Sequence, residues 1–360
     1  MKKSLIALAV LAASGAAMAQ SSVTLYGVAD AGVTYLNGAD NWSGVTSGNN
    51  LTSRLGFRGV EDLGGGLKAN FVIEGGFNLD NGDGASGYAG AKAGEGFQFK
   101  RRSTVGLSGG FGEVRMGREL TAAYNATARY DVFGSVGIGQ SRLWADGGVV
   151  DASANATAVT TNQRISNALT YVSPDFSGFK VGVNYGFGET TNGNSDSSYM
   201  GAGLMYDNGP LSLGLGLERL NSGANTVVAS DIDAWSLGGS YDFGVAKLLA
   251  GYRESKVDRA TGENKRLGYY VAATAPVGAG TVRVSYNRYE NELANVKGKA
   301  DQFAIGYVYG LSKRTSVYGT YAYIKNKDGA NLYTLGSSTQ GGLKNNGSQQ
   351  GVQVGVSHAF

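Results

Sequence analysis

Apolar and polar residues alternate with a period of two along most of the chain, and helical periodicity is rare. One face of residues 179–187 carries only Phe, Val and Tyr, whereas the other face carries Lys, Gly and Asn. In residues 211–218 four leucines alternate with Ser, Gly and Glu. Strict alternation is typical of β-strands with one apolar and one polar face. The pattern therefore predicts an all-β protein.

Sixteen segments show this alternation, and many are close to eleven residues long. A tilted strand of ~9–11 residues is enough to cross a bilayer. To within a few residues, the predicted strands are 22–36, 51–61, 67–77, 97–108, 111–119, 163–173, 178–188, 198–207, 211–220, 231–242, 246–256, 264–275, 280–290, 299–310, 314–325 and 350–360.

The connections between these segments alternate between short and long. The short ones include 62–66, 109–110, 174–177 and 207–210. The long ones are polar and rich in Gly, Asn and Ser, and they span 37–50, 78–96, 120–162, 291–298 and 326–349. A soluble Gly-rich sandwich also alternates, but nothing in that fold keeps every second connection short. An outer-membrane barrel has short periplasmic turns and long extracellular loops, so the pattern favours a barrel.

The faces opposite the apolar ones are rich in Gly, Ser, Asn, Lys and Arg, so we expect a wet interior. Sixteen strands enclose an aqueous channel, whereas eight would be filled by side chains. All three prolines fall at short turns, where a missing N–H breaks no ladder. Aromatic residues gather at strand ends and predict a girdle at the membrane interface. They are Phe176, Phe179, Tyr206, Tyr241, Phe243 and Phe360.

The first nineteen residues are typical of a secretory signal peptide. Lys2 and Lys3 precede a short apolar stretch at 5–13, and Ala17-Met18-Ala19 fits the small-x-small cleavage rule. We therefore expect residues 1–19 to be removed and residues 20–360 to form one barrel domain without a linker.

Composition excludes several function classes. The chain has no Cys, which excludes disulfide scaffolds, Cys-based zinc sites and thiol catalysis. A net charge of +3 is too small to favour a nucleic-acid partner. The single histidine, His358, lies two residues from the end, and we expect neither catalysis nor a cofactor. Asp80 and Asp83 suit Ca²⁺ in principle, but solvated loop charge is the favoured interpretation, and no metal site is predicted.

Several motifs resemble the general diffusion porins of Gram-negative outer membranes, in particular their β-proteobacterial branch. The resemblance covers the whole chain, and the motifs that carry it are 22–27, 53–59, 61–67, 105–107, 117–118, 167–171 and 355–360. It implies a 16-stranded antiparallel transmembrane β-barrel whose third loop folds inward. It also implies a multi-pass homotrimer in the outer membrane, in contact with lipid and lipopolysaccharide. Phe360 resembles the terminal aromatic residue that the barrel assembly machinery reads.

The narrow part of such a channel would be lined by charge. Arg54 and Arg58 are four residues apart and share one face of a strand. Leu55 and Phe57 take the lipid face, so both arginines are expected to point inward, since charge in hydrocarbon costs about 2–4 kcal/mol.

The resemblance extends this set. It places Arg54, Arg101 and Arg164 in the basic cluster of the constriction, adds Arg58 as a further basic position and assigns Glu74 to an acidic wall position. Asp131, in the long connection 120–162, is the acidic candidate on the inward loop. Arg102 departs from the family pattern and is expected to face outward, and Arg118 is not assigned a position.

These residues predict passive diffusion of small hydrophilic solutes and ions, with a mild preference for anions. Structural pairing of several arginines with loop carboxylates is the alternative reading of the basic cluster. The alternative function is a surface-exposed adhesin or structural barrel without an open channel, and its lumen would need larger apolar residues.

Overall fold

A computed structural model describes residues 22–84, 96–145, 163–188, 198–221, 230–259, 262–293, 296–328, 333–336 and 340–360. Within them, seventeen strands form one sheet in which every pair is antiparallel. Residues 1–19, for which a signal peptide is expected, lie outside the described residues. No helix in the described ranges has the length and apolar character needed to cross a bilayer.

The strands follow one another around the sheet in chain order. Their bounds are β1 Ser22–Asn37, β2 Asn41–Ser47, β3 Arg54–Gly64, β4 Leu67–Gly76, β5 Arg102–Gly109, β6 Gly112–Leu120, β7 Arg164–Val172, β8 Phe179–Gly186, β9 Tyr199–Asn208, β10 Leu211–Leu220, β11 Ser230–Asp242, β12 Lys247–Arg259, β13 Gly262–Val277, β14 Gly280–Leu293, β15 Val296–Gly310, β16 Thr315–Lys327 and β17 Ser348–Ala359.

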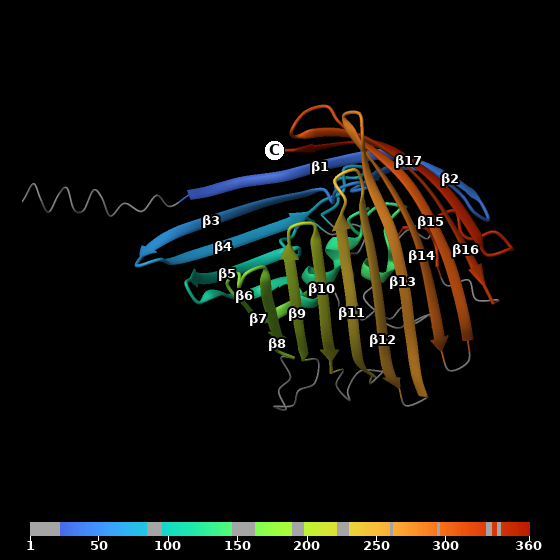
Figure 1. Cartoon of the computed structure of the whole chain (residues 1–360). Coiled ribbons are helices and arrows are strands. Elements are labelled where there is room, and N and C mark those ends of the chain that lie inside the picture. The colour runs from blue at the N-terminus through green and yellow to red at the C-terminus, as the bar shows by residue number, and fades with distance from the viewer. Residues whose placement is uncertain are drawn as a thin grey trace, which may run out of the picture.

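The sheet closes on itself where the first strand meets the last. β1 pairs with β17 from Val28, opposite Ala359, to Asn37, opposite Gln350. The N-terminal half of β1 pairs with β3, and its C-terminal half pairs with the short strand β2. β2 is therefore an addition at the mouth, and the other sixteen strands make up the closed barrel (Figure 1). This confirms the predicted 16-stranded antiparallel barrel.

Two of the predicted connections differ in the structure. The connection 37–50 was expected to be a loop, but residues 41–47 within it extend the first hairpin as β2. The predicted long loop 291–298 is wrong, because β14 runs to Leu293 and β15 starts at Val296. Both strands are longer than a membrane requires. Most residues of the expected loop therefore belong to the paired strands β14 and β15.

The outer face of the barrel carries the apolar residues, as predicted. Leu213, Leu217 and Leu237 are 43%, 49% and 49% exposed. Of the aromatic residues expected at strand ends, all but Tyr206 are exposed, and the half-buried Tyr206 contacts Phe179 at a ring-centroid distance of 4.3 Å. A closed sheet satisfies its backbone groups internally, so this apolar surface is compatible with lipid.

The third long connection folds into the barrel. It contains α2 (Ala122–Thr127), the 3₁₀ turn η1 (Ala128–Tyr130) and α3 (Arg142–Ala145). In Figure 1 these green segments lie between the strands of the two walls. α2 packs against β8 to β11, and this bears out the inward third loop implied by the resemblance.

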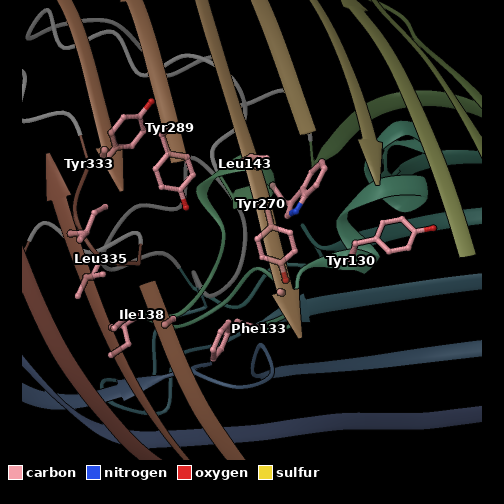
Figure 2. Packing of buried hydrophobic residues seen from close by; sticks show 14 of the residues in the cluster. Tyr130, Phe133, Ile138, Leu143, Tyr270, Tyr289, Tyr333 and Leu335 are labelled. Carbon is pink, nitrogen blue, oxygen red and sulfur yellow. The ribbon is translucent and has the colours of Figure 1, made fainter. Parts of the chain in front are cut away.

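The interior is not uniformly polar. Side chains from the third loop meet the inner faces of β12 to β16 in an apolar cluster, shown in Figure 2. Labelled members are Tyr130, Phe133, Ile138, Leu143, Tyr270, Tyr289, Tyr333 and Leu335. The expectation of an entirely wet inner face therefore needs correction: one side of the barrel interior is a packed core that seats the loop, because the loop must bury its own apolar residues.

Candidate functional site

A cluster of arginines around one glutamate lies on the inner face of the wall opposite the third loop. Glu74 on β4 accepts a hydrogen bond from Arg101 Nε at 2.7 Å, and Arg54 Nε lies 3.7 Å from its other carboxylate oxygen. The hydroxyl of Tyr26 on β1 donates to the same carboxylate at 3.0 Å. Register brings these groups together, because Glu74 stands opposite Gly56 while Arg54 stands opposite Gly76.

Two further arginines extend this cluster. Arg164, at the start of β7, donates from Nε to the backbone carbonyl of Arg101 at 2.9 Å. Arg58 is exposed, and its guanidinium carbon lies 5.4 Å from the ring centroid of Tyr26. The arginine wall, as we call Arg54, Arg58, Arg101 and Arg164, thus combines two arginines that contact Glu74 with two that lie against Arg101 and Tyr26.

The prediction that Arg102 faces outward is wrong. β5 begins at Arg102, which stands opposite Glu74 and so shares its inward face. Its guanidinium lies 3.7 Å from Glu119, and its Nε donates to Thr104 Oγ1. Arg101 precedes the strand at a bend, so alternation does not place the two neighbours on opposite faces. The sequence prediction had extended the strand back to residue 97.

Arg118 sits at an irregularity in β6, where the register with β7 shifts between Gly117 and Glu119. It stands opposite Ser103, donates from Nε to the carbonyl of Lys100 and from Nη1 to Ser166 Oγ. These contacts tie together the ends of three strands.

Glycines on the inner faces of β9 to β11 let the third loop approach the wall. A Cβ added to Gly214 would lie 2.0 Å from the carbonyl oxygen of Ala126, and one added to Gly203 would lie 2.2 Å from that of Ala122. At Gly238 it would lie 2.2 Å from the ring of Tyr130. Real Cβ atoms essentially never come so close, so these three positions, the glycine seat, accept only glycine while α2 stays where it is.

Polar contacts fix the ends of α2 on this seat. Thr121 caps the helix by accepting from Tyr124 N at 3.2 Å. The first helical N–H, from Ala122, is donated to Asn184 Oδ1 on β8 at 2.8 Å. At the other end Arg129 forms an ion pair with Asp207 and donates to Ser212 Oγ. The helix is thus held to the wall by both packing and hydrogen bonds.

Asp131 shapes the loop from within. Its Oδ1 accepts from the N–H of Phe133 at 2.9 Å, and its Oδ2 accepts from Ser135 at 3.0 Å and from Ser141 at 2.9 Å. The residue is only 6% exposed. Burial raises the pKa of Asp131 above its ordinary value, while the three N–H groups act in the opposite direction. The carboxylate is turned into the loop's own backbone rather than toward water.

Arg283 on β14 holds the loop from the opposite side, and the sequence pattern alone did not single it out. Its Nη1 donates to the carbonyl of Val132 at 3.1 Å, and its Nη2 donates to Asn50 Oδ1 at 2.9 Å. Its guanidinium carbon lies 4.8 Å from the ring centroid of Phe133. Alternation with Val282 and Val284 signals that Arg283 points inward, but not that it meets a loop about 150 residues away in sequence.

No group of three or more His, Cys, Asp or Glu residues able to hold a metal occurs within the described ranges. His358 Nδ1 lies 2.8 Å from Thr315 Oγ1 on the neighbouring strand.

Known proteins resemble this chain over nearly its whole length. A family model described as Gram-negative porin matches residues 5–329. Outer membrane porin protein 32 of Delftia acidovorans is 46% identical, with 100% of both chains covered. An outer membrane porin protein of Bordetella pertussis is 33% identical over 91% of this chain and 95% of its own. A solved structure of an anion-selective porin from Comamonas acidovorans has a TM-score of 0.82 and 41% identity, covering 95% of this chain and 100% of that one.

The chain belongs to the Gram-negative porin family. It is therefore a multi-pass outer-membrane protein, and its barrel forms a passive diffusion channel. This confirms the family, the location and the kind of function that the sequence motifs indicated.

In this porin the described part of the third loop carries one carboxylate, that of Asp131, and it is buried. The loop acids Asp146 and Asp151 lie outside the described residues. Among the described groups, the charge at the arginine wall is therefore strongly positive. The sequence indicated the residues of this wall but not the inward turn of the Asp131 carboxylate, because the three N–H donors become visible only in the folded loop.

Proposed function

We propose that this porin is a channel, without catalytic activity, that passes small hydrophilic solutes and ions and mildly prefers anions. The observation that carries the proposal is the arginine wall, in which Arg54 and Arg101 contact the carboxylate of Glu74 while Arg164 and Arg58 lie against Arg101 and Tyr26. The described loop that faces it offers no exposed carboxylate. The anion-selective title of the Comamonas acidovorans porin supports the same direction.

The proposed mechanism is electrostatic. Rings or walls of Arg and Lys favour anions because they lower the energy of a negative ion that has lost part of its water. Glu74 holds Arg54 and Arg101 in place through direct contacts, so the guanidinium groups are already oriented before a solute arrives. Arg54, Arg58, Glu74, Arg101 and Arg164 form the proposed constriction, and Asp131 takes part by shaping the loop that narrows it.

Single-channel recording in a planar bilayer tests this proposal. With purified protein and a KCl gradient, we expect discrete conductance steps and a reversal potential on the anion side. A barrel that acts only as an adhesin or structural protein would insert without steps. A reversal potential of cationic sign would leave the channel standing but would overturn the anion preference.

We also propose that the chain is exported as a precursor, loses residues 1–19 and assembles into a homotrimer. Phe360 is the proposed recognition residue for the assembly machinery. Its ring is 43% exposed beside the seam, and its backbone exchanges two hydrogen bonds of 3.1 Å with Gly27. The ring is thus displayed on the surface while the backbone is held in place.

Outer membranes from expressing cells should therefore yield a slowly migrating band without heating and a monomer band after heating. The mass of the monomer should correspond to a chain that starts at Gln20. Phe360→Ala should reduce the amount of the slow band, with Leu311→Ala, another exposed apolar residue at the short-turn end, as the control. Retention of residues 1–19 would contradict the removal of a signal peptide. One band at both temperatures would contradict the trimer, and equal yields of both variants would contradict the role of Phe360.

A further inference from the structure

A pocket lies on the inner side of β12 to β14, where α3 of the third loop meets the barrel. We call it the basic pocket, and the lining residues that matter here are Arg142, Arg253, Ser255, Arg266, Tyr289 and Tyr333. Its cavity volume is about 40 Å³, which is room for about three water molecules. The arginine wall lies around β3, β4 and β7 instead, so the two sites share no residue.

The basic pocket lies on the outer side of the third loop's attachment. β12 and β14 run in the same direction as β6, because every neighbouring pair of strands is antiparallel. Their ends therefore lie on the side where β6 leads into the third loop, which is the extracellular side. Ser255 is four residues from the end of β12, so a solute that enters from outside reaches the basic pocket early.

Register arranges the pocket in two inward rows. The outer row consists of Ser255, Arg266 and Asn291, and the inner row consists of Arg253, Gly268 and Tyr289. Gly268 leaves space between its neighbours, and a Cβ added there would lie 2.9 Å from Leu143 Cδ1. Leu143 of α3 thus packs over Gly268, and the third loop forms one side of the pocket (Figure 2).

Two of the three arginines are held in place by the protein. Arg253 Nη2 lies 2.8 Å from a carboxylate oxygen of Glu218, and the two side chains are only 8% and 6% exposed. Arg142 donates from Nη1 to the carbonyl of Gly336 and from its backbone N–H to the hydroxyl of Tyr289 at 2.9 Å. A solute therefore meets oriented guanidinium groups, and little side-chain entropy is lost when it binds.

The charge of the basic pocket is positive. Its lining contains three arginines and, within the described ranges, neither Asp nor Glu. The carboxylate of Glu218, which contacts Arg253, offsets only one of these charges. Guanidinium groups donate forked pairs of hydrogen bonds that match the oxygens of a phosphate or carboxylate.

Asn291 narrows the chemistry further. It is 1% exposed, and neither its Oδ1 nor its Nδ2 has a hydrogen-bond partner. Buried amides almost always have partners, because an unmet one is costly. Asn291 stands beside Arg266 in the outer row, with Ser255 on the other side of that arginine. The row thus offers a donor and an acceptor next to a positive charge. Hydrogen phosphate, which carries both acceptor oxygens and one O–H, satisfies both atoms of the amide, whereas sulfate has no proton to donate.

We propose that the basic pocket binds hydrogen phosphate on its way into the channel. Arg142, Arg253 and Arg266 supply the charge, Ser255 and Asn291 supply neutral hydrogen bonds, and the small volume disfavours longer anions such as succinate. The proposal names a substrate class for the channel and rests on the proposed channel function for its role in transport.

The test measures binding of inorganic phosphate, sulfate and succinate to the purified full-length porin in detergent, by calorimetry at constant ionic strength. Arg266→Gln removes one charge from the pocket. Arg288→Gln is the matched control, because Arg288 precedes Tyr289 on β14 but lies on the outer face, where it pairs with Asp301. The double variant Arg101→Gln with Arg164→Gln tests whether the arginine wall binds phosphate instead.

We expect saturable phosphate binding by the wild type, with sulfate and succinate weaker. Arg266→Gln should bind phosphate at least about tenfold more weakly, while Arg288→Gln and the double variant retain the wild-type affinity. Absence of saturable binding by the wild type, an equal loss in Arg288→Gln, or loss only in the double variant would each overturn the proposal.

Asn291→Leu keeps the proposal testable if Arg266→Gln does not fold. It replaces an unpartnered buried amide by an apolar side chain of similar size, so thermal unfolding without phosphate should occur no earlier than in the wild type. Its affinity for phosphate should fall to that for sulfate. A preserved preference for phosphate over sulfate would contradict the assignment of hydrogen phosphate.

Conductance separates this proposal from the channel proposal. Single-channel steps and the reversal potential in KCl are recorded without phosphate, so a wild type that conducts but does not bind phosphate loses only the basic pocket. Absence of steps in every preparation would end the channel proposal, while the binding comparison in detergent would still decide whether the pocket holds phosphate.

Discussion

Replacing Arg101 and Arg164 together by glutamine should abolish most of the anion preference of this porin. The change removes two of the four positive charges of the arginine wall. In a water-like dielectric, each charge acts on an ion ~8 Å away with about 0.5 kcal/mol. Removing two charges therefore raises the energy of an anion by about 1 kcal/mol and lowers that of a cation by about as much, so the ratio of anion to cation permeability should fall at least about fivefold. The reversal potential in a KCl gradient measures this ratio directly.

Arg219→Gln is the matched control for that experiment. It removes the same kind of charge from the outer face of β10, where Arg219 pairs with Asp233 through Nε at 2.6 Å. Its reversal potential should equal that of the wild type. If Arg219→Gln shifts selectivity as much as the double variant does, net charge rather than the arginine wall governs the preference. An unchanged reversal potential in the double variant would remove the wall from the mechanism.

Gly214→Val should lift α2 from the glycine seat and disturb the constriction. The added Cβ would lie 2.0 Å from the carbonyl oxygen of Ala126, so the helix must move toward the lumen. Overpacking of this kind costs about 1–3 kcal/mol. We therefore expect a lower or noisier single-channel conductance, together with loss of the slowly migrating gel band at a lower temperature than for the wild type.

Gly319→Val on β16 provides the comparison, because a Cβ there meets no heavy atom nearer than 4.0 Å. This variant should retain wild-type conductance and thermal behaviour, and its β-branched side chain suits a strand. If Gly214→Val shows the same conductance and thermal behaviour as Gly319→Val, the position of the loop does not depend on the glycine seat.

Strand alternation predicted the barrel well because a two-residue period is enforced by lipid on one side of every strand. Leu213, Leu217 and Leu237 could be assigned to the outer face from sequence alone, and the sheet confirms them. β2 escaped prediction because one of its faces mixes Asn41 and Ser43 with Val45, so apolar and polar residues do not alternate along it.

The residues of the proposed site could be named from the sequence, whereas their arrangement could not. Arg54 and Arg58 can be assigned to one face because they lie an even number of residues apart on one strand, whereas the faces of Arg101 and Arg102 depend on where β5 begins. Alternation does not hold across the start of a strand, so the sequence assigned Arg102 to the wrong face. The buried position of Asp131 depends on backbone donors from the loop itself, and no periodic pattern encodes that arrangement.

The pairing of β1 with β17 also determines when this protein can become a finished pore. β17 pairs with β16 on one side and with β1 on the other, so it joins the two ends of the strand order. A chain cut short by one hairpin would retain two unsatisfied edges, which hydrocarbon penalises and which invite aggregation. Closure of the ring therefore depends on β1 and β17 together, since loss of either strand leaves an edge that hydrocarbon does not satisfy.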